Sequence, residues 1–237
     1  NGNFLFTTNS VKKAAKFEDD DQTFLFLPLA HVFARILVNS VIAVGNTMTF
    51  FRGMETLVDD FQIVRPHFFS SVPRIFEKVY SKVISGAEAK GGAALKIFNW
   101  AKGVGSEVSE LIIAKKNIPF MLGLKYKVAT KLVFSKVQGA LGGRVRFCIS
   151  GAAPLNPEIA KFFHGAGVLV LEGLGMSENT SVTNVNRPDN YKFGYVGQPV
   201  EGVEQKIAED GEICFRGGNI MQEYYKMPEK TAETFRD

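Results

Sequence analysis

Two glycines, a serine and a glutamate follow an apolar run in the last third of the chain, and their types suit the binding of a charged ligand. Residues 168–171 have the composition of a buried strand, and they lead into Gly173 and Gly175. Glycine lets the main chain approach a ligand closely or adopt positive φ. Ser177 adds a hydroxyl that donates and accepts, and Glu178 adds a hard carboxylate ligand suited to Mg²⁺. The alternative is an ordinary turn with a solvated glutamate.

A second strand end carries small residues of the same kind. Residues 144–149 have β character and lead into the small-residue segment 150–155. Asn156 is a suitable N-cap for the helix that follows. Consecutive parallel strands end at one edge of an open sheet, and ligands bind at that edge. We therefore expect residues 151–153 and 172–178 to form one site.

A third candidate for the site is His31. A β-rich run over residues 23–27 is followed by Pro28, and an apolar helix is expected over residues 31–37. His31 would then begin a helix at the carboxyl end of a strand, where ligand-facing residues are often found. A single histidine beside Val32 and Phe33 is also a common core residue, and the sequence leaves both interpretations open.

The elements that must position these residues alternate between apolar runs and helices. Runs over residues 47–51 and 67–72 flank a helical segment over residues 54–61. This alternation is typical of βαβ units and a parallel sheet. We therefore expect an α/β fold with a mostly parallel sheet flanked by helices.

A basic helical insertion is expected over residues 74–142. From Pro73 onward, apolar residues recur about every four positions, which predicts amphipathic helices, further ones lying over residues 95–116 and 124–141. Residues 74–146 hold fourteen Lys and Arg against four Asp and Glu, a balance of +10, so the rest of this +4 chain carries −6. Such a block can face phosphates or an anionic membrane, or it can be a solvated helical face.

Composition and spacing exclude several classes of protein. The apolar stretch over residues 32–44 is too short to span a bilayer and is interrupted by Arg35. The chain has two cysteines, Cys148 and Cys214, and it lacks a CxxC pair and a histidine cluster, which argues against zinc. Both lie in apolar segments, so we expect reduced, buried thiols in a cytoplasmic protein. A dinucleotide fingerprint is rejected because Glu178 replaces its third glycine.

After Glu178 the chain changes to short β segments punctuated by glycine, with Asp210 and Gly211 as a typical hairpin turn. We expect residues 185–237 to form part of a small antiparallel, β-barrel-like subdomain, and residues 1–184 to form the α/β subdomain. The chain starts without Met and stops just after a helical pattern, so we also expect a fragment of a longer protein.

Six motifs, in order and in spacing, resemble those of the acyl-adenylate-forming enzymes over essentially the whole chain. They are Pro28-Leu29-Ala30-His31, Val72-Pro73-Arg74, Ser150-Gly151-Ala152-Ala153-Pro154-Leu155, Leu171 to Glu178, Val196-Gly197-Gln198-Pro199, and Gly211-Glu212-Ile213-Cys214-Phe215-Arg216-Gly217. The combination most resembles a long-chain fatty acid–CoA ligase. Full-length enzymes of that family use ATP and Mg²⁺ to make a fatty acyl-AMP, and then transfer the acyl group to coenzyme A.

The resemblance implies a role for each matching residue. The implied ATP- and AMP-binding residues are Gly151, Ala152, Ala153, Glu172, Gly173, Leu174, Gly175, Met176 and Ser177. Glu178 matches the magnesium-ligand position, and Ser177 matches the residue that contacts the phosphate, so these two are the implied catalytic residues. The implied acyl-binding residues are His31, Val196 and Gly197.

The sequence also departs from the family pattern. Leu174 stands where the family usually has an aromatic residue that stacks on adenine, a contact of about 1–3 kcal/mol for a base on an aromatic ring. The phosphate loop with its Lys, the ribose-binding Asp and the C-terminal lid domain with its catalytic Lys are not among these residues. We therefore expect the chain alone to be inactive and to bind ATP weakly.

The resemblance further implies the partners ATP, fatty acid, coenzyme A and Mg²⁺. A cytoplasmic location is expected from the cysteines, and the basic segment allows peripheral contact with an anionic membrane. A homodimer is also allowed, and no nucleic-acid partner is expected. Two other functions stay open. One is an adenylating ligase for another carboxylic acid, and the other is a non-catalytic lipid- or membrane-binding module.

Overall fold

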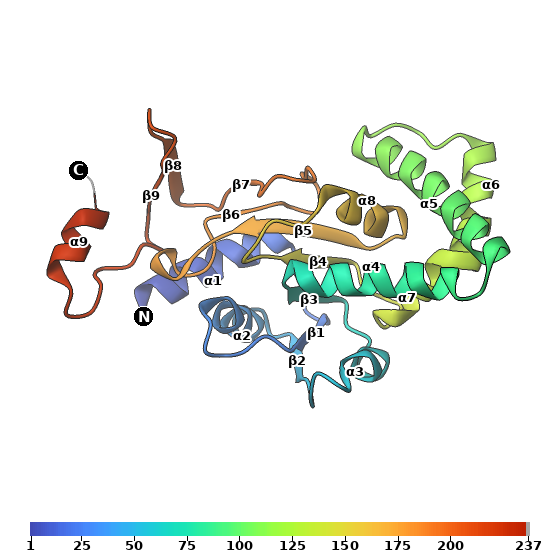
Figure 1. The fold of residues 1–237 in the computed structure, drawn as a ribbon. Coiled ribbons are helices and arrows are strands. Elements are labelled where there is room, and N and C mark those ends of the chain that lie inside the picture. Colours follow the sequence, from blue (N-terminus) through green and yellow to red (C-terminus); the bar gives the residue numbers. More distant parts are fainter. Residues whose placement is uncertain (236–237) are drawn as a thin grey trace.

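The structure is a computed structural model that describes residues 1–235, and Figure 1 shows its α/β architecture. The strands are β1 (Gln22–Leu25), β2 (Thr47–Phe50), β3 (Phe68–Ser71), β4 (Phe147–Ser150), β5 (Leu169–Leu174), β6 (Asn184–Val185), β7 (Gln198–Pro199), β8 (Val203–Ile207) and β9 (Ile213–Gly217). The main sheet has the order β2-β1-β3-β4-β5-β6-β7. Strands β1 to β5 run parallel, which confirms the predicted sheet, and β6 and β7 are antiparallel.

Helices cover both faces of this sheet. They are α1 (Gly2–Ala15), α2 (Val32–Val44), α3 (Leu57–Val64), α4 (Pro73–Glu88), α5 (Gly92–Ile113), α6 (Phe120–Ala129), α7 (Ser135–Ala140), α8 (Pro157–Gly165) and α9 (Pro228–Thr234), with a π turn η1 (Thr130–Phe134) and a 3-10 turn η2 (Ser177–Asn179). Helix α8 begins as expected, because the Asn156 side chain accepts a hydrogen bond from the Glu158 amide at 2.9 Å.

The alternation of side chains along the strands divides the core in two. Phe69 of β3 and Cys148 of β4 face the larger cluster, together with residues of α3, α4, α5 and α8. Their neighbours Phe68 and Phe147 face the smaller cluster, which contains residues of α1 and α2. The two rings of this second pair stack with centroids 5.5 Å apart. The sheet is therefore buried on both sides, as parallel sheets usually are.

The helical insertion extends from one end of the sheet, where α5 and α6 project at the end opposite to β8 and β9 (Figure 1). The helical region predicted over residues 124–141 is seen as α6, η1 and α7 in unbroken succession, so the helix contains a π segment. The hydroxyl of Thr130 donates to the carbonyl oxygen of Tyr126 at 2.8 Å, a side-chain bond of the kind that loosens regular helix geometry. Ala129 and Val133 are buried in this region and attach it to the larger core.

The chain after β5 first extends the main sheet and then leaves it. Strands β6 and β7 pair with β5 and with each other, so the sheet continues past residue 185. Strands β8 and β9 form a separate hairpin around the expected turn. The division of the chain into subdomains at residue 185 stays a prediction.

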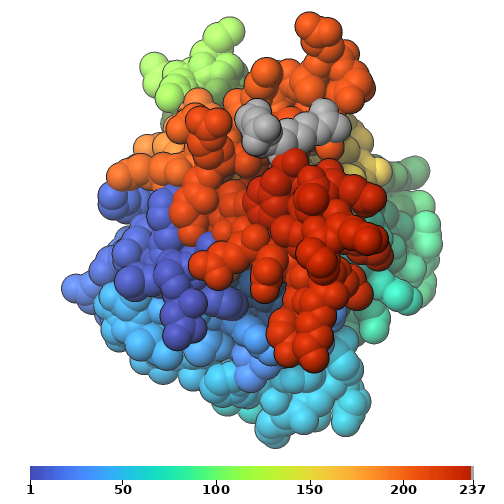
Figure 2. Space-filling view, turned by 90° about the vertical axis from the view of Figure 1, so that its left-hand side faces the viewer, coloured from blue at the N-terminus to red at the C-terminus, as the bar shows by residue number. Residues whose placement is uncertain are grey.

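The C-terminal segment lies over the end of the molecule beside helix α1, as Figure 2 shows in red and blue. Asn3 donates from its side-chain amide to the carbonyl oxygens of Gly218, at 3.0 Å, and of Ile220. Helix α1 begins at Gly2, and the ring of its residue Phe6 packs closely on Gly218.

The remaining sequence expectations concern the cysteines and the membrane. Both cysteines are free thiols, but only Cys148 is buried, and its burial raises the pKa of that thiol well above the usual range. Cys214 lies half-buried in β9, so the prediction that both are buried holds for one of them. Within residues 1–235, no helix combines the length and the apolar character needed to cross a bilayer.

Candidate functional site

A cavity of about 430 Å³ lies at the carboxyl edge of the parallel sheet. This is within the size range of small-molecule sites, roughly 300–1,000 Å³. Its lining residues come from α2, the ends of β1, β3, β4 and β5, and the return to β6: Leu27, Pro28, His31, Val32, Phe33, Ala34, Val72, Ile149, Gly151, Ala152, Gly173, Leu174, Gly175, Met176, Ser177, Ser181, Val182, Asn184 and Val185. The expected meeting of the segments after β4 and β5 is therefore seen at this cavity.

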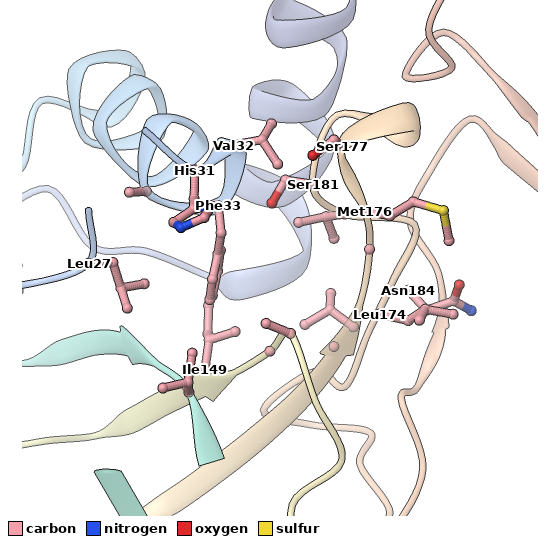
Figure 3. A pocket seen from close by; sticks show the side chains of 18 of the residues that line it. Leu27, His31, Val32, Phe33, Ile149, Leu174, Met176, Ser177, Ser181 and Asn184 are labelled. Carbon is pink, nitrogen blue, oxygen red and sulfur yellow. The ribbon is translucent and has the colours of Figure 1, made fainter. Parts of the chain in front are cut away.

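The two walls of the cavity differ in character. On one side the ring of Phe33 stands between α2 and the end of β4, and on the other side lies the aliphatic side chain of Leu174 (Figure 3). Gly151 makes the approach of the ring possible, because a Cβ atom there would lie 3.3 Å from Phe33 Cε1. The cavity thus offers one aromatic and one aliphatic face to a flat or extended ligand.

The loop after β4 is held in an unusual backbone conformation. Ala152 has φ of 70°, in the left-handed region that residues with a side chain seldom occupy. Such a conformation costs about 1–2 kcal/mol. Non-glycine residues in this region concentrate at ligand-binding loops, where the surrounding structure holds them. Ala152 lines the cavity, and the neighbouring Ala153, predicted to bind nucleotide, is not among the lining residues.

Gly175 is required by close backbone contact at the end of β5. A Cβ atom at this position would lie 1.3 Å from the carbonyl oxygen of Ser181. That oxygen is placed by two left-handed residues, Thr180 with φ of 53° and Ser181 with φ of 84°. The Ser181 amide donates to the Met176 carbonyl oxygen at 2.9 Å and closes the loop. The segment therefore folds back on itself, and the main chain forms the cavity wall.

Glu172 is a buried connector in this structure. Its side chain is only 5% exposed, and each carboxylate oxygen accepts a backbone hydrogen bond. The Leu155 amide donates to Oε2 at 3.1 Å, and the Gly194 amide donates to Oε1 at 2.9 Å. The carboxylate does not line the cavity, so its predicted contact with the nucleotide stays a prediction. Its visible effect is to hold the loops on both sides of β5.

Ser177 and Glu178 form the first part of turn η2 and lie differently. Ser177 is exposed and lines the cavity, whereas Glu178 does not. The Tyr224 hydroxyl donates to Glu178 Oε1 at 2.8 Å, and the Met221 amide donates to the Glu178 carbonyl oxygen at 2.7 Å. The hydrogen bond to the carboxylate raises the pKa of Tyr224, because ionised tyrosine would repel the glutamate. Glu178 thereby connects the sheet edge to the segment before α9.

The capacity of this site for a metal rests on one carboxylate. Among the described residues, no group of three or more His, Cys, Asp or Glu is arranged to hold a metal ion. Within the described part of the chain, Oε1 of Glu178 accepts from Tyr224, and no hydrogen bond reaches the other carboxylate oxygen, Oε2. This donor set suits Mg²⁺, which is commonly held by one or two carboxylates together with substrate phosphates.

The residues predicted to bind the acyl group are divided in the structure. His31 is exposed at the N-cap of α2 and lines the cavity (Figure 3). Val196 and Gly197 lie outside the lining. Gly197 has φ of 80°, and a Cβ atom there would lie 2.4 Å from the Asn186 amide nitrogen. Glycine is needed at position 197 because the main chain packs closely there. The acyl-binding role of Val196 and Gly197 stays a prediction.

Several lining residues were missed by the sequence analysis. Phe33 follows His31 by two positions, and its place in the first turn of α2 was the available indication. Ile149 is the penultimate residue of β4 and was assigned only to the strand. Ser181 and Asn184 reach the cavity because the chain turns back after η2 to form β6. That reversal depends on the left-handed pair at 180 and 181, which the sequence did not reveal.

Comparison with known proteins assigns this chain to a family. The model of the family described as AMP-binding enzyme matches residues 1–225. The chain is 34% identical over 234 residues to fatty acyl-CoA synthetase A of Dictyostelium discoideum, with 92% of this chain and 33% of that protein covered. It is 36% identical over 228 residues to long-chain-fatty-acid–CoA ligase 5 of Mus musculus, with 90% and 32% covered.

A solved structure shares the fold. The N-terminal domain of FACL13 from Mycobacterium tuberculosis superposes with a TM-score of 0.67 at 15% identity, and the match covers 99% of this chain and 50% of that one. The chain belongs to the AMP-binding enzyme family. It spans about a third of the length of the curated relatives named above.

Proposed function

We propose that this chain is the part of a long-chain fatty acid–CoA ligase that holds the nucleotide and the acyl carboxylate. The proposal is supported by one observation above others. Three separate motifs, at His31, at residues 151–152 and at residues 173–177, meet around a single cavity of about 430 Å³. The names of the relatives, which are fatty acyl-CoA synthetases and ligases, support the choice of a fatty acid as the carboxylic acid.

In the proposed reaction the carboxylate oxygen attacks the α-phosphorus of ATP, pyrophosphate leaves, and the acyl-AMP then reacts with the thiol of coenzyme A. The main-chain walls at Gly151 and Gly175 would hold the nucleotide by close approach, and Ser177 would donate to a phosphate oxygen. Catalysis of this kind depends on positioning and on charges that stabilise the phosphoryl oxygens, and it needs no covalent nucleophile.

Glu178 would hold Mg²⁺ together with the phosphates of the substrate. When bound, the metal would neutralise charge that develops on the phosphate oxygens. His31 and Phe33 would border the carboxylate end of the fatty acid, since both line the cavity beside α2. Val196 and Gly197 would act further along the acyl chain. Leu174 would contact adenine without stacking.

The substitution Glu178→Gln in the intact protein tests the proposal. The amide keeps the shape of the side chain and removes its charge, so we expect carboxylate-dependent exchange between ATP and pyrophosphate to be abolished while the near-UV circular dichroism is unchanged. Glu209→Gln, at an exposed carboxylate in the β8–β9 turn, is the matched control. Exchange close to that of the unsubstituted protein would contradict the assigned role of Glu178.

The acid itself is tested by a series of chain lengths in the same exchange assay. A maximum for long-chain acids is expected, and a maximum for an aryl, acetyl or amino acid substrate would favour another adenylating ligase. A cytoplasmic location, peripheral membrane contact and a homodimer are separate parts of the proposal. They do not depend on the identity of the acid.

A further inference from the structure

The outer side of helix α6 exposes large apolar side chains. Phe120 is 84% exposed, Met121 62% and Leu124 51%. Val128, near the end of α6, and Leu132, in the π turn, are also exposed. We refer to these five residues as the apolar stripe. Scattered apolar residues are normal on a protein surface, but a contiguous group indicates a binding surface.

Helical spacing places the apolar stripe on one side of the helix. Phe120, Leu124 and Val128 are four residues apart, a spacing at which side chains are neighbours on a helix surface. The opposite side carries Ala129 and Val133, which are buried against the core of the insertion. The helical segment thus packs on the rest of the chain through its inner side. The apolar stripe, on the outer side, takes no part in that packing.

Lysines border the apolar stripe and the turn that precedes it. At about 100° per residue, Lys125 and Lys127 fall on the two sides of the stripe, and Lys131 continues the basic border. Lys115 and Lys116 are exposed in the turn between α5 and α6. Within residues 1–235, none of these five lysines forms a salt bridge. The sequence has no Asp or Glu between Glu110 and Glu158, so their charge is not offset locally.

A convex apolar stripe between rows of cations has the chemistry of a helix that lies in a lipid–water interface. Nucleic acid would use the lysines and leave Phe120 and Leu124 in water. A second copy that docked through the same face would bring like charges together. We propose that the apolar stripe inserts at the surface of an anionic lipid bilayer, with the bordering lysines against the lipid headgroups.

The position of α6 in the molecule is compatible with this docking. Figure 1 shows α5 and α6 at the end of the molecule opposite to β8, β9 and α9. The cavity lies at the carboxyl ends of the strands, and so at the other end of the sheet from the insertion. Docking through α6 would leave the mouth of the cavity accessible from water. The proposal assigns a surface to the peripheral membrane contact named under the proposed function and rests on that part of it, but it does not depend on the ligase activity, which the exchange assay tests separately.

The first experiment is co-sedimentation of the intact protein with vesicles of phosphatidylcholine, with and without phosphatidylserine, at low and high salt. We expect binding to the anionic vesicles only, weakened by salt because exposed charges are screened. The double substitution of Phe120→Asn and Leu124→Asn should lower the partition coefficient at least roughly tenfold, since it removes two buried apolar groups from the interface. These side chains are exposed, so the fold should be retained.

A matched control removes exposed apolar residues elsewhere. Ile42 on α2 is 74% exposed and Ile63 on α3 is 70% exposed, and the double substitution of Ile42→Asn and Ile63→Asn should bind vesicles like the unsubstituted protein. The proposal is overturned by absence of binding, by equal binding to neutral and anionic vesicles, or by unchanged binding of the α6 variant. A self-associating protein whose assembly depends on Phe120 and Leu124, with no vesicle binding, would also overturn it.

Fluorescence tests insertion as distinct from adsorption. The chain has one tryptophan, Trp100. A background of the intact protein in which Trp100 and every other tryptophan are replaced by Phe, with Phe120→Trp added, reports on α6 alone. Addition of anionic vesicles should shift the emission to shorter wavelength, because the indole leaves water. Vesicle binding without a shift would show that the lysines act alone, and it would overturn the inserted arrangement.

Discussion

The cavity at the sheet edge and the apolar stripe are both apolar surfaces, and they differ in curvature. The cavity at the sheet edge is concave, and its walls include the main chain at Gly151 and Gly175. The apolar stripe is convex, and it consists of side chains on α6 and on the π turn that continues it. Both surfaces expose carbon to water, but a concave surface can enclose a small molecule and a convex one can contact only an extended partner. Curvature therefore separates a ligand site from a docking surface when composition alone does not.

The two regions also differ in how their polar groups are used. Around the cavity, Glu172 and Glu178 form hydrogen bonds that hold loops in place. Around the apolar stripe, lysines are unpaired and exposed within the described part of the chain. The first region is fixed by contacts with distant parts of the chain, and substitutions there should be costly. The second should tolerate substitution with little effect on folding.

The largest expected effect comes from glycine-to-alanine substitution in the two regions. Gly175→Ala forces a methyl group into the Ser181 carbonyl, so we expect a loss of about 4 kcal/mol or more in the free energy of unfolding, through overpacking. Gly123→Ala in α6 meets no atom within 4 Å. It should stabilise the chain by up to about 1 kcal/mol through helix propensity. Urea unfolding gives the free energy of unfolding of both variants. Equal changes in the two variants would contradict the proposed difference between the cavity wall and α6.

The stability of the packing between helices α5 and α8 should depend on pH through His164, which lies in α8. Its Nδ1 lies 2.7 Å from Ser109 Oγ in α5, and its Nε2 lies 2.8 Å from the Tyr191 hydroxyl. Burial lowers the pKa of His164 from 6.5 to about 4. The unfolded chain thus binds the proton first as pH falls, and stability should decline from about pH 6.5 towards pH 4. The loss should reach at most about 3 kcal/mol.

Urea unfolding at several pH values tests this dependence. The variant His164→Gln should be less stable at neutral pH and should show a smaller decline on acidification. The exposed His31 provides the control, and His31→Gln should retain the full slope. An unchanged slope in the His164 variant would show that another group is responsible.

A smaller effect is expected at the connector Glu172. In Glu172→Gln one oxygen still accepts, but the amide nitrogen cannot accept from the second backbone donor. A buried amide, of Leu155 or of Gly194, is left without a partner, and this should cost about 1–3 kcal/mol. Hydrogen exchange should show faster exchange at these two amides while those of α6 stay unchanged. Unaltered protection of both would contradict the proposed role of the carboxylate.

The smallest effect concerns the contact between Glu178 and Tyr224. The carboxylate raises the pKa of the Tyr224 hydroxyl above its usual value of 10.0. In Glu178→Gln the pKa of Tyr224 should fall back towards that value, because the neutral amide no longer opposes ionisation. Absorbance titration of the tyrosinate in metal-free buffer, compared with a Tyr224→Phe variant, assigns the change. A constant pKa would mean that the two side chains are apart in solution.

The sequence predicted the parallel sheet well, because its determinants are local. Alternating runs, Pro73 at the start of a helix and Asn156 as an N-cap are each decided by a few neighbouring residues. The meeting of residues 151–152 with 173–177 also followed, since consecutive parallel strands share one edge.

The parts that the sequence did not predict depend on distant contacts. The role of Glu172 as a connector requires the amide of Gly194, which is 22 residues away. Phe33 lines the cavity and packs closely on Gly151, which belongs to the loop after another strand. The apolar stripe was hidden in a periodic pattern, because periodicity alone does not show which apolar residues of a helix are left uncovered.

The absence of acidic residues between Glu110 and Glu158 has a consequence for control. This stretch also contains no histidine, so it lacks the side chains that titrate between mildly acidic and neutral pH. Acidification of the surroundings would leave the charge of α6 unchanged, although it would lower the stability of the packing around His164. One route to control of the apolar stripe is acylation of a bordering lysine such as Lys125 or Lys127, which removes its charge. The other is a change in the anionic lipid content of the membrane.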